Sequence, residues 1–190
     1  MPPPQFQQHY IAQPGQPGAV QDHALKASFN KPAQKVVVVN ASSAGFDAGN
    51  FAKIKIDDVE VEFPKAATER GLHIVILDPK SGHIKNAGIF DTYKSSESLN
   101  EFIFKGVPQG DIVVAACKDE CTRAMSSTGK YWFSDMGSKE IWKLAYRHSW
   151  AFIGCMGNKE ATEKRALTTA ESVNVTKILM LDALGSGASS

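Results

Sequence analysis

The stretch that decides the fold is Gly110–Gly154, GDIVVAACKDECTRAMSSTGKYWFSDMGSKEIWKLAYRHSWAFIG. It opens with an apolar, β-branched run, Asp111–Cys117, of the length and composition of a buried strand, which breaks into charged residues around Asp119. A second strand is predicted at Ser149–Gly154, directly after Arg147. The side chains of Asp119 and Arg147 can meet only if these two strands run antiparallel, and the sequence permits this arrangement.

Between the two strands, Ser126–Met136 is predicted to form a short helix that Gly137 terminates. A second helix is predicted upstream, capped by Ser95 or Ser96 and running through Lys105. It places three apolar residues on one face at i, i+3 and i+4 spacing: Leu99, Phe102 and Ile103.

Further strands are indicated by alternating or β-branched runs at 35–40, 51–56, 59–63, 72–77, 83–91 and 173–181. Loops are expected at 42–50 and, as a loop or frayed helix, at 158–165. Strands interleaved with helices and hairpins predict an α/β fold, a mixed-sheet α/β sandwich, rather than a doubly wound parallel sheet. We expect a single domain at 34–182, a disordered Pro/Gln-rich tail at 1–33 and a flexible tail at 183–190.

Charge and hydropathy narrow the classes of partner. Lys+Arg 21 against Asp+Glu 20 leaves the chain near neutral, so bulk electrostatics support neither a nucleic-acid partner nor an anionic membrane. No apolar run reaches the roughly 18 residues of a membrane span, so we expect no membrane insertion. The N-terminus lacks the basic and apolar regions of a secretory signal, which predicts a cytoplasmic protein or one exported by another route.

The three cysteines, an odd number, lie in or near apolar segments, which favours a reducing compartment. Cys117 and Cys121 have the proximity of half a zinc site, but no second cysteine pair and no suitably spaced histidine accompany them. We therefore expect no metal and no cofactor.

Seven blocks resemble, in order, the ILEI/PANDER-like domain family, over about 35–157 with an extension to 181. The blocks are Arg70–Asp78, Gly82–Ile84, Phe90–Tyr93, Gly110–Val114, Lys118–Glu120, Met136–Ser138 and Arg147–Gly154. The family includes cytokine-like secreted proteins and the stem domain of the protein O-mannose N-acetylglucosaminyltransferase, and the chain resembles the stem-domain branch most closely. In that branch two arginines and an aspartate bind a terminal β-linked N-acetylglucosamine, and the resemblance places them at Arg70, Asp119 and Arg147.

The chemistry of such a site is sound. Sugar hydroxyls are both donors and acceptors, so an aspartate and two guanidinium groups can hold adjacent hydroxyls through charge-assisted bonds. Trp150, Tyr93 and Trp142 are candidates for the wall under the sugar ring, although each is more often a core residue. Asp119 is expected to hold both arginines when the site is empty. From spacing alone, an ordinary Arg–Asp–Arg ion-pair cluster is the simpler interpretation, and the resemblance favours the sugar site.

Three functions are compatible with these residues. The first is a carbohydrate-binding protein, a lectin, whose partners are glycans or glycoproteins and whose weak single sites call for a homo-oligomer. The second is a cytokine-like, protein-binding signalling domain without sugar binding. The third, a glycoside hydrolase using Asp119 and Glu120, is disfavoured, because adjacent residues of an extended chain point to opposite faces. We therefore predict that the chain is not an enzyme.

Overall fold

The computed structural model describes residues 35–181. The tails predicted at 1–33 and 183–190 lie outside these residues. Within the described part, neither helix has the length and apolar character needed to cross a membrane.

Five strands form the first arm of the sheet, antiparallel throughout and ordered β5-β4-β6-β7-β8. Their bounds are β4 (Gly71–Leu77), β5 (Ile84–Phe90), β6 (Ile112–Asp119), β7 (Trp150–Cys155) and β8 (Thr162–Arg165). Every residue of β4 is buried, as expected of an apolar strand covered on both faces.

Four strands form the second arm, ordered β3-β2-β1-β9, and these are also antiparallel neighbours. Their bounds are β1 (Lys35–Gly45), β2 (Phe51–Ile56), β3 (Val59–Glu60) and β9 (Val173–Leu181), with a 3-10 turn, η1 (Phe46–Ala48), after β1. The two arms join where β1 runs parallel to β6 over two residue pairs, Ala44 with Lys118 and Gly45 with Asp119. The sheet is therefore mixed, which confirms the predicted fold class.

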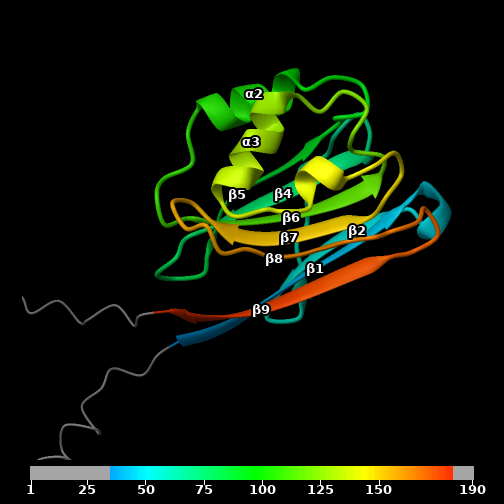
Figure 1. The fold of residues 1–190 in the computed structure, drawn as a ribbon. Helices are drawn as coiled ribbons and strands as arrows, with labels where there is room; N and C mark the ends of the chain where they lie inside the picture. The colour runs from blue at the N-terminus through cyan, green and yellow to red at the C-terminus, as the bar shows by residue number, and fades with distance from the viewer. Residues whose placement is uncertain (1–34, 182–190) are drawn as a thin grey trace, which may run out of the picture. The chain divides into compact units, whose positions relative to one another are not determined.

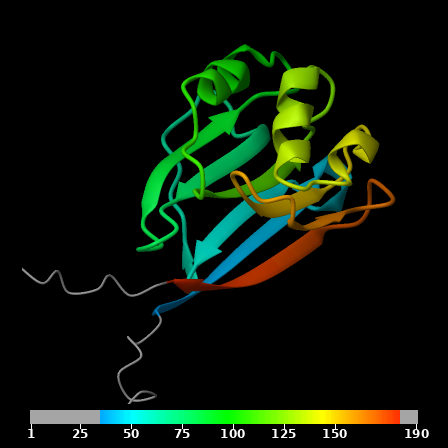
Figure 2. The same ribbon diagram turned by 60° about the vertical axis from the view of Figure 1, so that its left-hand side comes forward.

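Two apolar cores fill the layers that Figure 1 shows. In both views, α2 (Glu97–Phe104) and α3 (Ser127–Asp135) cover one face of the first arm, and the second arm lies on its other side (Figure 2). The core under the helices is aromatic, centred on Phe133, Trp150 and Phe152. The core between the arms is mostly aliphatic. The helices thus bury the aromatic face of the first arm.

Three segments differ from their predicted structure. β1 continues through Ser43 to Gly45, where a loop was expected, because small residues there fit between β2, β6 and β9. β8 is a strand where a loop or frayed helix was predicted, because its polar side chains lie on an edge strand beside β7. The predicted strand 59–63 is reduced to the two residues of β3.

Candidate functional site at the strand ends

The three predicted sugar-binding residues come together at one end of the sheet. Arg70 directly precedes β4, and its neighbour Gly71 is paired with the residue before Asp119 on β6. Asp119 is in turn paired with Gly45, the last residue of β1. A Cβ atom on Gly45 would collide with the carbonyl oxygen of Arg147, so the chain before β7 lies against this same point. β6 and β7 are antiparallel, so the end of β6 and the beginning of β7 lie at the same edge of the sheet.

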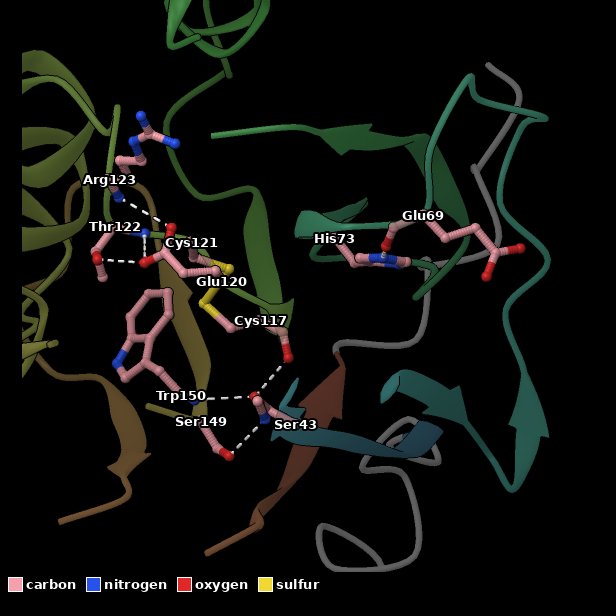
Figure 3. The surroundings of a disulfide bond; sticks show 11 residues. Ser43, Glu69, His73, Cys117, Glu120, Cys121, Thr122, Arg123, Ser149 and Trp150 are labelled. Carbon is pink, nitrogen blue, oxygen red and sulfur yellow. Dashed lines mark hydrogen bonds between the residues drawn. A yellow bond between two sulfur atoms is a disulfide. The ribbon is translucent and has the colours of Figure 1, made fainter. Parts of the chain in front are cut away.

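Two buried serines join these strand ends (Figure 3). The Ser43 hydroxyl on β1 donates to the carbonyl oxygen of Cys117 at 2.6 Å and accepts the backbone N–H of Trp150 at 2.9 Å. The Ser149 hydroxyl accepts the backbone N–H of Gly45 at 2.9 Å. The serine hydroxyls thus form hydrogen bonds with backbone groups at the points where the strands diverge. These bonds fix the relative positions of β1, β6 and β7.

A disulfide between Cys117 and Cys121, with Cα atoms 5.9 Å apart, encloses the end of β6 (Figure 3). The expectation of reduced cysteines was therefore wrong for this pair, and Cys155 is the free cysteine of the described residues. Asp119 lies inside the enclosed loop and has the left-handed backbone conformation, φ 64°, which aspartate tolerates better than most residues. The disulfide thus holds Asp119 in a turn that a free chain seldom adopts.

Glu120, the neighbour of Asp119, has a different role. Its side chain is buried, and its carboxylate accepts the backbone N–H groups of Thr122 at 2.7 Å and Arg123 at 3.0 Å (Figure 3). These bonds shape the loop after β6. The two adjacent carboxylates therefore differ in environment, one in the protein interior and one half-buried at the strand end.

Arg70 is held by Asp91, not by Asp119. Its Nε lies 3.0 Å from Oδ1 and its Nη2 2.7 Å from Oδ2 of Asp91, a two-pronged ion pair. These hydrogen bonds hold the pKa of Asp91 below its usual value and raise the pKa of Arg70, to which the charge of Asp119 also contributes. The Arg70 guanidinium lies 4.1 Å from the ring centre of Tyr93, and that of Arg123 lies 4.7 Å from the same ring.

Arg147 lies among exposed aromatic rings that the sequence did not single out. Its guanidinium is 4.3 Å from the ring centre of Phe46 and 5.2 Å from that of Tyr146, and these two residues are 49% and 51% exposed. Asp47 approaches its Nη1 at 4.0 Å, while its buried Nε has no hydrogen-bond partner. Arg147 also has a left-handed backbone, φ 58°, an uncommon conformation that occurs more often at functional sites.

The expectation that Asp119 holds both arginines was therefore wrong. Within residues 35–181, no ion pair or hydrogen bond joins the Asp119 side chain to either arginine, because Asp91 and Asp47 occupy them. The Asp119 carboxylate remains a half-buried acceptor whose charge acts on the Arg70 guanidinium.

The three aromatic candidates for the sugar-binding wall lie in different environments. Trp150 is fully buried and donates its indole N–H to Glu163 at 3.0 Å, so it belongs to the core and forms no sugar-binding wall. Trp142 is 46% exposed, and its indole N–H donates to Ser134 of α3 at 2.7 Å, which attaches it to the helix surface. Tyr93 alone of the three contacts a predicted site residue, through Arg70.

Comparison with known proteins finds a family match that spans these residues. Residues 70–158 match the family described as Interleukin-like EMT inducer, a range that includes both arginines and Asp119. The chain carries an ILEI domain. This confirms the resemblance to the ILEI/PANDER-like family, while the closer likeness to the glycosyltransferase stem domain stays a prediction. Phe46, β1, β2 and β9 lie outside the matched range.

The relatives of this ILEI domain are larger proteins. The chain is 33% identical to the human cell migration-inducing and hyaluronan-binding protein over 103 residues, 53% of this chain and 8% of that protein. It is 31% identical to human protein FAM3A over 106 residues, 54% of this chain and 46% of the relative. It is 29% identical to Danio rerio protein FAM3C over 103 residues, 54% of this chain and 45% of the relative. The chain thus spans less than half the length of each relative.

Proposed function

We propose that this ILEI domain is a cytokine-like, protein-binding signalling domain that acts without catalysis. The observation that carries the proposal is the exposed surface formed by Phe46, Tyr146 and Arg147. Aromatic residues and arginine are the types enriched in the centres of protein interfaces, where they bury large areas at low cost in conformational entropy. The interleukin-like description of the family and the similarity to the FAM3 proteins support the same function.

The geometry favours a preformed contact surface. Phe46 follows β1 directly and Tyr146 lies shortly before β7, and the buried serine network ties these strands together. Side chains held on a rigid base lose little freedom when a partner binds, so more of the contact energy appears as affinity. A receptor or other protein with an acidic patch beside an apolar one would complement this surface.

Site-specific photo-crosslinking tests this function. A photoreactive phenylalanine analogue replaces Tyr146 in the full chain, which is applied to intact cells of the source organism, and captured proteins are identified by mass spectrometry. The matched control carries the analogue at Tyr131, an exposed aromatic residue on α3. We expect a discrete partner at position 146 that is absent at 131 and is lost with Arg147→Ala. Identical proteins captured at both positions would contradict the proposal.

A second candidate function is binding of a carbohydrate at Arg70, Asp119 and Arg147. The observation that favours it is the half-buried Asp119 acceptor beside the Arg70 guanidinium, with the backbone of Arg147 at the same strand ends, because hydroxyl pairs require both donors and acceptors. One relative is named as hyaluronan-binding, and a polysaccharide with carboxylate groups would also suit arginine. Glycoproteins as partners would satisfy both candidate functions.

Calorimetry separates the two candidates. The full chain is titrated with a β-linked N-acetylglucosaminide, with hyaluronan oligosaccharides and with a matched glucoside as control. A lectin of this kind binds a single terminal sugar in the high-micromolar to millimolar range, since few atoms make contact. Heat with either test ligand but not with the glucoside supports the carbohydrate site, and no heat with any of them rejects it while leaving the protein-binding function standing.

A further inference from the structure

The free edge of β9 is the least protected edge of the sheet. On one side β9 pairs with β1 along its whole length, from Leu181 opposite Lys35 to Val173 opposite Ser43. On its other side no strand is paired within residues 35–181. A row of backbone N–H and C=O groups on that side is therefore available to another strand.

The other edge strands in the described part have features that disfavour pairing with a further strand. β3 is only two residues long, and three of the four residues in β8 are charged. β5 carries a lysine, an asparagine and a glycine, and its pairing with β4 is irregular near Ile76. By contrast β9, VNVTKILML, is nine residues long and has one charged residue, Lys177, with neither proline nor glycine. Proteins normally shorten, charge or twist an edge to prevent such pairing, and Lys177 is the one such device within β9.

The outward face next to this edge is apolar. Ile178 and Met180 on β9 are 62% and 59% exposed, and they lie directly across from Val38 and Val36 on β1, which are also exposed. The four side chains form one contiguous cluster, since cross-strand partners on one face of a sheet are in contact. An apolar cluster beside an unpaired edge is the combination expected where a further strand is added.

We propose that β9 pairs antiparallel with β9 of a second copy of this chain about a two-fold axis. The four-stranded arm of each copy then becomes half of an eight-stranded sheet, and the two apolar clusters lie on the same face of it. A second copy is the occupant that suits this edge, because a two-fold contact joins two identical strands and β9 carries a single charged residue, Lys177. A register offset from the centre of β9 keeps Lys177 from facing its own copy. The near-neutral net charge of +1 also permits close approach of two chains.

The pairing lies outside the range that matches the ILEI family, and it does not depend on the proposed function. The strand-end site is formed around β4, β6 and β7, and pairing through β9 leaves β5 and the helices untouched. A dimer of this kind carries two strand-end sites, which would raise its avidity for a partner displayed in several copies.

Sedimentation analysis of the full chain over a wide concentration range tests the pairing. We expect a reversible species of twice 20.6 kDa. Ile178→Lys places a charge in the apolar cluster and should weaken the dimer about tenfold or more. Ile84→Lys is the matched control, because Ile84 is also an exposed isoleucine at a sheet edge, on β5, and it should leave the dimer unchanged. Circular dichroism of each variant confirms that it folds.

Amide hydrogen exchange distinguishes edge pairing from other contacts. In the dimer the outward amides of Val173–Leu181 should be protected, and dilution or Ile178→Lys should expose them. A dimer that breaks with Ile178→Lys but leaves these amides unprotected would indicate face-to-face packing and overturn the proposal. A monomer at all concentrations overturns it as well, and protected β9 amides in that monomer would assign the edge to another part of the same chain.

Discussion

Arg70 and Asp91 form a two-pronged ion pair, with Nε 3.0 Å from Oδ1 and Nη2 2.7 Å from Oδ2. The pair fixes the guanidinium at the beginning of β4, beside the end of β6, where Asp119 lies. The candidate site is thus preformed, with the arginine oriented by a residue other than the proposed ligand acceptor.

Replacement of Asp91 by asparagine should lower the stability of the domain by about 1 kcal/mol at neutral pH, because both partners are partly exposed. The pKa of Asp91 is depressed in the folded state, so this stabilisation is present above its unfolded value of 3.8 and is lost as pH falls through the folded value. Urea unfolding of wild type and Asp91→Asn should therefore differ at pH 7 and converge in acid. Asp58→Asn, at an exposed turn, is the matched control and should unfold as the wild type does at pH 7.

Asp119→Asn should leave folding stability nearly unchanged, because Asp119 forms no ion pair within the described residues and asparagine tolerates its left-handed backbone. If the strand-end site binds sugar, the loss of a charge-assisted bond should cost about 1.5–3 kcal/mol, roughly ten- to a hundredfold in affinity. Calorimetry with an N-acetylglucosaminide on both proteins measures it. Equal affinities would place any bound sugar elsewhere.

Trp150→Ala should destabilise the domain by about 3–5 kcal/mol, since the side chain is fully buried against Phe133 and Phe152. Trp142→Ala is the matched control, because Trp142 is 46% exposed, and its cost should be about 1 kcal/mol or less. Denaturant unfolding of both variants gives the comparison. A small effect at position 150 would show that the aromatic core packs differently.

His73 should make the protein less stable as pH falls. Burial lowers the pKa of His73, and its Nδ1 has no hydrogen-bond partner while Nε2 bonds the carbonyl oxygen of Glu69 at 2.8 Å. Between the unfolded pKa of 6.5 and the lower folded value, the unfolded chain binds more protons, so stability decreases as pH falls through this window. Unfolding free energies measured from pH 8 downward should show this slope, and His73→Gln should flatten it. An unchanged slope in the variant would assign the pH dependence to other groups.

A strong reductant should lower the melting temperature by removing the Cys117–Cys121 disulfide, which closes a short loop and is worth about 2 kcal/mol. The double variant Cys117→Ser with Cys121→Ser should melt at the lower temperature with or without reductant. Cys155→Ser should respond to reductant as wild type does, because Cys155 is free. Thermal unfolding of each protein with and without reductant gives the melting temperatures. An equal melting temperature of the wild type in both conditions would contradict the expectation.

Much of the local structure could be predicted because its signals are local. The β-branched run at β6 and the alternating run at β9 identified buried and half-buried strands, since side-chain periodicity directly reports which faces are covered. Ser126 caps the start of α3, and its hydroxyl accepts the N–H of Gly129 at 3.2 Å. A left-handed Gly137 follows the end of the helix. The sequence also determined that Asp119 and Arg147 stand at strand ends.

Tertiary structure alone decided which of these groups meet. The pairing of Arg70 with Asp91, the rings of Phe46 and Tyr146 beside Arg147, and the Cys117–Cys121 bond depend on how strands distant in sequence are registered. The strand β8 depends equally on β7, because its charged residues have little strand preference of their own and pair with the neighbouring backbone of β7. Local pattern therefore determines which segments form strands and helices, whereas the partners of each polar side chain follow from packing, where backbone satisfaction and close approach select one arrangement.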